Sequence, residues 1–285
     1  MSYPVFLTER HFISNLANRT IGLTLLLFST AAFAAESPTA EDPEVLLQRI
    51  RSKMATHLAH LPNYTCHEVI DRLVRCTNSG TFEHLDRVEL EVAFLGKREL
   101  FSRPGEDRFK EQEIHNLVPV GTIGNGVFGA HVDTIFTGHA AEFKYIGPVK
   151  KDGHKAFRYD FRVPQENSHF LVRRGSAEGI VGYKGSFWVD TETLDLVWVE
   201  IKVDRIPSHI GVSMVEELMQ YKLMRIRNSD FLLPRNSQLT TSDKSGNYSL
   251  NIISLERCRE FTGESAVTYG APADDVSADR EVSQH

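Results

Sequence analysis

The feature that most constrains the fold is a polar connector between two runs of alternating side chains, at residues 183–203. In the first run, Phe187 and Val189 are two positions apart, and the residues next to them are either polar or would face the other side of a strand. The second run continues this alternation. A period of two places alternate side chains on opposite faces of a strand. Two such runs around a short polar connector predict a β-hairpin. The alternation slips between Trp198 and Ile201, which is compatible with a β-bulge there.

The rest of the chain after residue 140 repeats this character, with β-branched and aromatic runs separated by turn residues. We predict strands at residues 141–146, 156–161, 169–172, 177–189, 194–204, 212–227, 231–240 and 248–260. The run 212–227 also fits helical spacing, through Met214 and Leu218, but its β-rich neighbours favour a strand. Earlier strands are predicted at 63–74, 88–92 and 99–101. These runs predict a mainly β (α+β) fold built on an antiparallel sheet.

Two segments have helical character. Asp42 is suited to cap a helix whose first residue is Pro43, and an apolar stripe runs from there to about residue 61. The second segment is 127–136, where one helical face carries Val127, Phe128, Val132, Ile135 and Phe136. It follows a glycine-rich stretch at 121–126 that matches neither a dinucleotide-binding nor a Walker pattern. We consider two interpretations of the second helix, a lid over an apolar concavity and a helix packed in the core.

The N-terminal 35 residues have the pattern of a secretory signal peptide. Arg10 and Arg19 precede an apolar run at 21–28, and Ala32 and Ala34 form a small-residue cleavage pattern. The apolar run is shorter than the ~20 residues of a membrane-spanning helix, although an uncleaved anchor is an alternative. We therefore expect a periplasmic or secreted protein of the bacterial envelope with no transmembrane span after cleavage.

The amino-acid composition limits both the class of protein and the extent of the folded domain. The 285 residues are 41% hydrophobic and 25% charged with a formal net charge of -6, which is ordinary for a globular protein and gives no nucleic-acid-binding footprint. Residues 263–285 are small, polar and acidic, and we predict a disordered tail there. One domain over residues 36–262 remains.

The chain has three cysteines, and export permits disulfides. Cys66 and Cys258 lie near opposite ends of the predicted domain, in runs that both have strand character. We favour a disulfide between them, which would stabilise the fold by about 4–5 kcal/mol in the chain-entropy model. A pairing of Cys66 with Cys76 would need a turn between them, and three buried thiols are a further alternative.

Motifs for catalysis, metals and cofactors are not found. The sequence has no G-x-S-x-G, H-E-x-x-H, C-x-x-C or Walker pattern. His57 and His60 are one helical turn apart but have no evident third ligand, so we interpret them as surface residues. Asp190, Glu192 and Asp195 cluster in the hairpin connector, where carboxylates are usually solvated. We therefore predict no enzyme activity, no cofactor and no metal.

Several weak motifs in this order resemble one group of proteins. They are the opening at 63–66, the Gly185-x-x-Trp188-x-Asp190 pattern and the Leu-Leu-Pro run at 232–234. Together with the signal, the helices and the hairpins, they resemble the LolA/LolB/MucB-like bacterial envelope proteins. The opening and the ending at 258–265 also resemble secreted acidobacterial proteins. The resemblance implies a curved antiparallel sheet, or open half-barrel, with an N-terminal helix and a helical lid on its concave face.

The first functional hypothesis is a non-enzymatic carrier or receptor for an apolar ligand, such as a lipid or a lipoprotein acyl chain. The expected apolar lining consists of Phe128, Val132, Ile135, Phe136, Trp188 and Trp198. The two tryptophans, the only ones in the chain, are alternatively cross-strand core residues. The second hypothesis is an envelope protein-interaction or stress-sensor module with a protein partner. The third is a hydrolase of unrecognised type.

Overall fold

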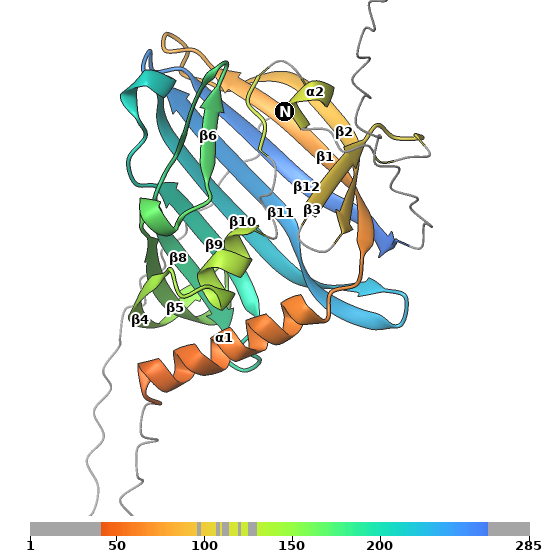
Figure 1. The fold of residues 1–285 in the computed structure, drawn as a ribbon, viewed down its shortest axis with the longest axis vertical. Coiled ribbons are helices and arrows are strands. Elements are labelled where there is room, and N and C mark those ends of the chain that lie inside the picture. Colours follow the sequence, from red (N-terminus) through yellow and green to blue (C-terminus); the bar gives the residue numbers. More distant parts are fainter. Residues whose placement is uncertain are drawn as a thin grey trace, which may run out of the picture. The chain divides into compact units, whose positions relative to one another are not determined.

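The computed structural model describes residues 41–95, 98–106, 109, 114–118, 121–124 and 130–261. It is mostly β, as predicted, and its main feature is a ten-stranded antiparallel sheet (Figure 1). The strands of the chain are β1 (Tyr64–Arg75), β2 (Glu83–Leu95), β3 (Arg98–Ser102), β4 (Glu142–Lys151), β5 (His154–Val163), β6 (Leu171–Arg174), β7 (Ala177–Ile180), β8 (Tyr183–Asp190), β9 (Leu196–Val203), β10 (Val212–Ile226), β11 (Ser229–Asp243) and β12 (Tyr248–Glu260). The predicted signal peptide and tail lie outside the described residues and stay predictions.

The order in the large sheet is β3-β2-β1-β12-β11-β10-β9-β8-β5-β4, and β6 and β7 form a separate two-stranded sheet. Most neighbours are consecutive in sequence, so the sheet is largely a series of hairpins. In the described part of the chain the two edge strands, β3 and β4, do not pair with each other, and the sheet stays open. Two pairs are exceptions to consecutive order: β5–β8, which skips β6 and β7, and β1–β12, which joins the two ends of the domain.

A disulfide crosses this β1–β12 pair and confirms the favoured cysteine pairing. Cys66 and Cys258 are bonded, and Cys76 is a free, exposed thiol. The bond closes a loop across a sequence separation of 192 residues. Such a cross-link removes conformational freedom from the unfolded chain.

Two details of the predicted strands are wrong. The run 177–189 is two strands, because the chain passes close to another backbone segment at Gly182, where a Cβ atom would lie 2.9 Å from the Gln165 nitrogen. β7 then pairs with β6, and β8 with β5. The irregularity in the β8–β9 hairpin lies between Trp188 and Val189, opposite Val197, rather than beyond Trp198. The ambiguous run is the strand β10, between β9 and β11.

Helix α1 (Pro43–Ala59) begins as predicted, because the Asp42 side chain accepts a hydrogen bond of 2.8 Å from the Glu44 amide. Its apolar stripe is buried, although Val45 at its start is 52% exposed. The second predicted helix is described only from residue 130. It consists of α3 (Ala130–Val132) and a π-helical turn, η1 (Asp133–Thr137), and a further short helix, α2 (Ile114–Leu117), precedes it. No helix in the described ranges has both the length and the apolar character needed to cross a bilayer.

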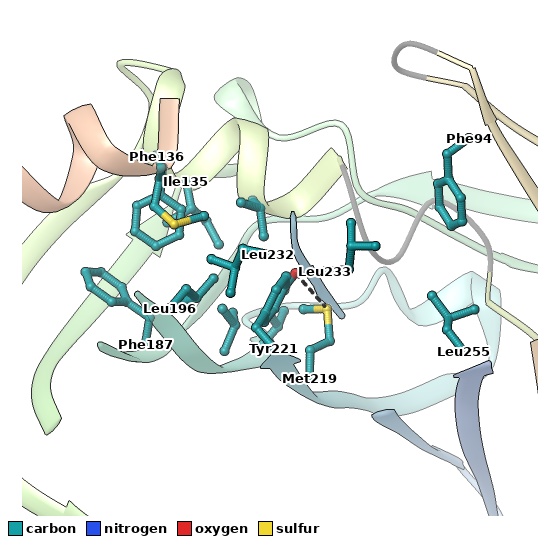
Figure 2. Close-up of a cluster of buried hydrophobic side chains, with 14 of the residues drawn as sticks. Phe94, Ile135, Phe136, Phe187, Leu196, Met219, Tyr221, Leu232, Leu233 and Leu255 are labelled. Atoms are coloured by element: carbon teal, nitrogen blue, oxygen red, sulfur yellow. Dashed lines mark hydrogen bonds between the residues drawn. The ribbon is translucent and has the colours of Figure 1, made fainter. Parts of the chain in front are cut away.

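The main core lies on one face of the sheet, which we call the core face. Here η1 presents Ile135 and Phe136 to side chains of the sheet, as Figure 2 shows. The Phe136 and Phe187 rings are 4.9 Å apart, edge to face, and Tyr159 stacks on Phe187 at 5.2 Å. We call Ile135, Phe136, Tyr159, Phe187 and Leu196 the aromatic core; their side chains are 0–1% exposed.

Helix α1 is fixed to the same side of the sheet. The Tyr159 hydroxyl donates a 2.8 Å hydrogen bond to the Pro43 carbonyl. Arg51 donates to the carbonyl oxygens of Phe136 and Gly138, so α1 also holds η1 in place. Together α1 and η1 cover the aromatic core.

Candidate binding cleft

A cleft of about 990 Å³ lies beside the aromatic core, over strands β10, β11 and β12. Its walls come from three places: the sheet, the β6–β7 hairpin with the residues leading into it, and residues 114–118 with 121–124. The lining residues are Ile114, Asn116, Val118, Gly121, Thr122, Ile123, Gly124, His131, Phe170, Leu171, Val172, Arg173, Arg174, Gly175, Val212, Val215, Glu217, Leu239, Thr241, Ser242, Asp243, Asn247 and Ser249. The volume is at the upper end of the range of roughly 300–1,000 Å³ for small-molecule sites.

The floor of the cleft follows from strand alternation. On β10, Val215 and Glu217 are buried while Met214 and Glu216 beside them are not, as the period of two requires. The lining of this strand runs from Val212 to Glu217. Five steps at roughly 3.3 Å per residue give a length of about 16 Å. The cleft is therefore long enough for an elongated ligand.

The β6–β7 hairpin covers one side of this floor. Val172 of β6 belongs to a second hydrophobic cluster together with Val215 and Leu239 of the sheet. Ile210 joins the same cluster from the turn before β10. This apolar contact holds the hairpin over β10 and β11 and gives the cleft part of its apolar wall.

The segment 121–124 forms another wall and is anchored by polar contacts. The Asn251 amide nitrogen donates a 2.9 Å hydrogen bond to the Thr122 carbonyl. At Gly121, with φ of +83°, a Cβ atom would lie 2.7 Å from the Arg72 guanidinium, so the backbone approaches the sheet closely there. Arg72 is itself fixed by a 2.6 Å hydrogen bond to Asp86. These contacts hold the segment 121–124 in place, and the cleft lies between this segment and the β6–β7 hairpin.

Glu217 is the most unusual lining residue, because it is only 2% exposed. Its register neighbours on either side are Ile201 of β9 and Leu239 of β11. Ser237 donates a 3.1 Å hydrogen bond to its Oε1 atom. Burial raises the pKa of Glu217 to about 8, the Ser237 hydrogen bond opposes this shift, and the nearby Glu99 adds to it. Glu217 is therefore mostly a neutral carboxylic acid at pH 7.

His131 is the second buried ionisable group of the cleft. Its ring contacts Phe170 at 4.7 Å and Tyr183 at 5.4 Å, both edge to face. Burial among these rings lowers the pKa of His131 to about 4. Its imidazole is consequently neutral at pH 7, so neither buried ionisable side chain brings a net charge into the cleft.

Among the described lining residues, the charged side chains are Arg173, Arg174 and Asp243 at the rim, and they are paired. Arg174 donates a 2.8 Å hydrogen bond to the Gly211 carbonyl and lies 3.5 Å from Asp243. Hydrogen bonds from Asn247 are the main reason that the pKa of Asp243 is lowered. Arg173 pairs with Glu178 at 2.7 Å. The cleft thus combines apolar walls, a neutral polar end and a charge-balanced rim.

The structure separates the residues that the sequence predicted as ligand lining. Val132, Ile135 and Phe136 are buried in the main cluster, and none of them is among the lining residues of the cleft. Phe128 lies outside the described residues. The neighbouring His131 does line the cleft, so the second helix reaches its edge through a residue that the apolar pattern did not select.

Trp188 and Trp198 face away from the main cluster. They are a direct cross-strand pair, and they form a separate cluster with Ala156, while Phe187 and Val199 beside them in sequence belong to the core face. The Lys151 ammonium lies 4.5 Å from the Trp188 ring and 5.7 Å from the Trp198 ring. This is a cation–π arrangement on the opposite face of the sheet.

The acids of the hairpin connector have structural partners. Asp190 accepts hydrogen bonds from the Glu192 and Thr193 amides, of which the Thr193 bond contributes most to the lowered pKa of Asp190. Asp195 forms an ion pair of 2.7 Å with Lys53 and lies 3.1 Å from His57, both on α1. Burial raises the pKa of Asp195, but these cationic and hydrogen-bonding partners together lower it. Within the described ranges, no group of three or more His, Cys, Asp or Glu residues is arranged to hold a metal ion.

Glu217 was not predicted from the sequence, although a signal for it exists. In β10 the positions Val215, Glu217, Met219 and Tyr221 alternate on one face and are all buried. An ionisable residue at an otherwise apolar position of a strand indicates either that the position is at the surface or that the side chain has a function. The same reasoning applies to Glu68 in β1, which is 4% exposed.

No protein-family model matches the chain, and no curated protein compared with it matches either. Among solved structures, it is similar to a domain from Vibrio parahaemolyticus described as an outer membrane lipoprotein-sorting protein (10% identity, TM-score 0.41, 77% of this chain and 94% of that one). It is also similar to a DUF1329 family protein from Desulfovibrio piger (11% identity, TM-score 0.45, 79% and 95%). A LolA superfamily protein from Nitrosomonas europaea is a third such structure (9% identity, TM-score 0.38, 75% and 93%).

The chain thus resembles structures of the group that the sequence resemblance named, the LolA-like proteins. The resemblance to acidobacterial proteins stays a prediction. The nature of any ligand has to be argued from the cleft itself.

Proposed function

We propose that this protein is a non-enzymatic carrier or receptor of the bacterial envelope that holds an apolar ligand, such as a lipid or a lipoprotein acyl chain, in the cleft over β10–β12. The observation that supports the proposal is the cleft's volume of about 990 Å³ together with its lining. Val172, Val215 and Leu239 give it an apolar floor and wall. Burial of apolar ligand surface stabilises a complex by roughly 25 cal/mol per Å² before the costs of association.

The proposal changes the part assigned to the predicted lining residues. Ile135 and Phe136 pack against the sheet in the main hydrophobic cluster, together with residues of α1. The predicted helical lid is not required, because the β6–β7 hairpin already covers the floor of the cleft. The envelope location depends on the predicted signal peptide, and the Cys66–Cys258 disulfide is compatible with an oxidising compartment.

A binding experiment with a blocked cleft tests the proposal. We expect the full chain to bind the uncharged fluorescent probe N-phenylnaphthylamine and native mass spectrometry to show co-purified lipid. Val215→Trp fills the floor of the cleft and should weaken probe binding by about tenfold or more, or ~1.4 kcal/mol. The matched control is Ile252→Trp, which adds the same ring at a 41% exposed position of β12.

The expected result is a loss of binding in Val215→Trp alone. Equal probe affinity in wild type and in both variants would contradict the proposed site. Wild-type protein that binds no probe and carries no lipid would contradict the proposed function.

A further inference from the structure

Glu217 is a buried ionisable side chain in the lining of the cleft. Ser237 is its hydrogen-bond partner through Oε1. No described residue forms a hydrogen bond with its Oε2 atom. Oε2 of Glu217 is not among the fully enclosed atoms that lack a partner, in contrast to Oε2 of Glu68, and this agrees with its place in the lining of the cleft. A ligand atom in the cleft can therefore complete the hydrogen bonding of Oε2.

The surroundings decide what that ligand atom is. Ile201 and Leu239 flank Glu217 on the neighbouring strands, and the Phe170 and His131 rings line the same cleft. In this neutral environment the carboxyl group keeps its proton at pH 7, and the proton can be donated only to an acceptor. A ligand carboxylate or ammonium group would need to be desolvated here without an opposite charge, which is costly. An ester or amide carbonyl oxygen meets both conditions.

We propose that the Glu217 carboxyl group is the hydrogen-bond donor that orients the ligand, and that the cleft selects apolar molecules with an uncharged carbonyl acceptor, such as an ester-linked acyl chain. This inference rests on the proposed function and names the ligand class for the same cleft. The Oε1 atom stays with Ser237, and Oε2 donates its proton to the ligand carbonyl. The acyl chain then lies along the Val212–Glu217 floor, between the hairpin and residues 114–118 and 121–124.

The test uses two uncharged probes of equal chain length, dioctanoylglycerol and its diether analogue, which lacks both carbonyl groups. Their affinities are measured by displacement of N-phenylnaphthylamine from the full chain. Wild type should prefer the ester by about fivefold to tenfold, the size expected for one net hydrogen bond. Glu217→Leu should abolish the preference, to within about twofold, by weakening ester binding. Glu217→Gln should keep it, because the amide donates from the same position.

Glu68→Gln is the matched control. Glu68 is another buried glutamate on the core face with a pKa raised to about 8 by burial, but it does not line the cleft. This variant should keep the ester preference of wild type. An ester preference that survives in Glu217→Leu, or a wild type that binds octylamine more tightly than the ester, would overturn the inference.

A pH series provides a second readout. The ester preference of wild type should fall above pH 8, where Glu217 ionises, and should not fall in Glu217→Gln. The groups near enough to affect Glu217 are Ser237, Glu99 and Tyr221, and His131 lines the same cleft. The pKa of Tyr221 is far above this range and that of His131 is far below it. Probe binding without any ester preference contradicts this inference alone, whereas no probe binding by wild type contradicts the proposed function as well.

Discussion

The aromatic core and the cleft lie on the same face of one sheet, yet one is filled and the other is hollow. In the aromatic core, α1 and η1 bring Ile135 and Phe136 into contact with Phe187 and Leu196 (Figure 2). Over the cleft, the covering elements are a two-stranded hairpin and an irregular segment, each fixed by its own contacts. The comparison shows that the covering elements, rather than the strands, decide where this fold leaves space.

A matched pair of leucines gives the largest expected effect. Leu196, 1% exposed in the aromatic core, is packed on all sides, whereas Leu239, 6% exposed, has the cleft on one side. Leu196→Ala should lower the free energy of unfolding by about 4 kcal/mol, and Leu239→Ala by about 2 kcal/mol, because less contact is lost beside existing space. Urea denaturation measures both. Equal losses would mean that the cleft wall is as tightly packed as the aromatic core.

The second prediction concerns the pH dependence of stability that the buried Glu68 causes. Glu68 is enclosed, and its Oε2 atom has no hydrogen-bond partner in the structure described here. Burial, with a contribution from Glu99, raises the pKa of Glu68 to about 8. The unfolded chain releases this proton near pH 4.5, so the folded state holds more protons between the two values. Stability therefore falls as pH rises from 4.5 to 8 and is constant above.

Glu68→Gln should remove this part of the pH dependence. Between pH 6.5 and 8, wild type should lose about 2 kcal/mol more than the variant, and the titration of His131 contributes equally to both proteins. Denaturation at a series of pH values measures the difference. Parallel curves for the two proteins would show that Glu68 is ionised in the fold at neutral pH.

The cap of α1 gives the smallest expected effect. Asp42→Ala removes the hydrogen bond to the Glu44 amide at 2.8 Å and should lower the free energy of unfolding by about 1 kcal/mol. Because α1 covers the aromatic core and contributes no residue to the cleft lining, affinity for N-phenylnaphthylamine should not change. Thermal denaturation and probe titration check both statements. A loss of probe binding would show that the two regions are coupled.

Much of the local structure could be predicted because it depends on neighbours in sequence. The Asp42 cap and the start of α1 follow from spacing and residue type, and the strand at residues 212–226 follows from the β-rich runs on either side of it. The break at Gly182 could not be predicted, because it depends on a distant backbone segment at Gln165. For the same reason, apolar pattern alone did not separate Ile135 from Trp188: both are buried, but on opposite faces of the sheet.

The sequence by itself determined the series of strands, the N-terminal helix and, through the positions of Cys66 and Cys258, the favoured disulfide. Each of these depends on local conformational preference or on the order of elements along the chain. Only the tertiary structure decided where the hollow lies and that Glu217 faces it. Burial of a carboxyl group is a property of its surroundings. Those are assembled here from β9, β11, the β6–β7 hairpin and residues 114–118 and 121–124, which are far apart in sequence.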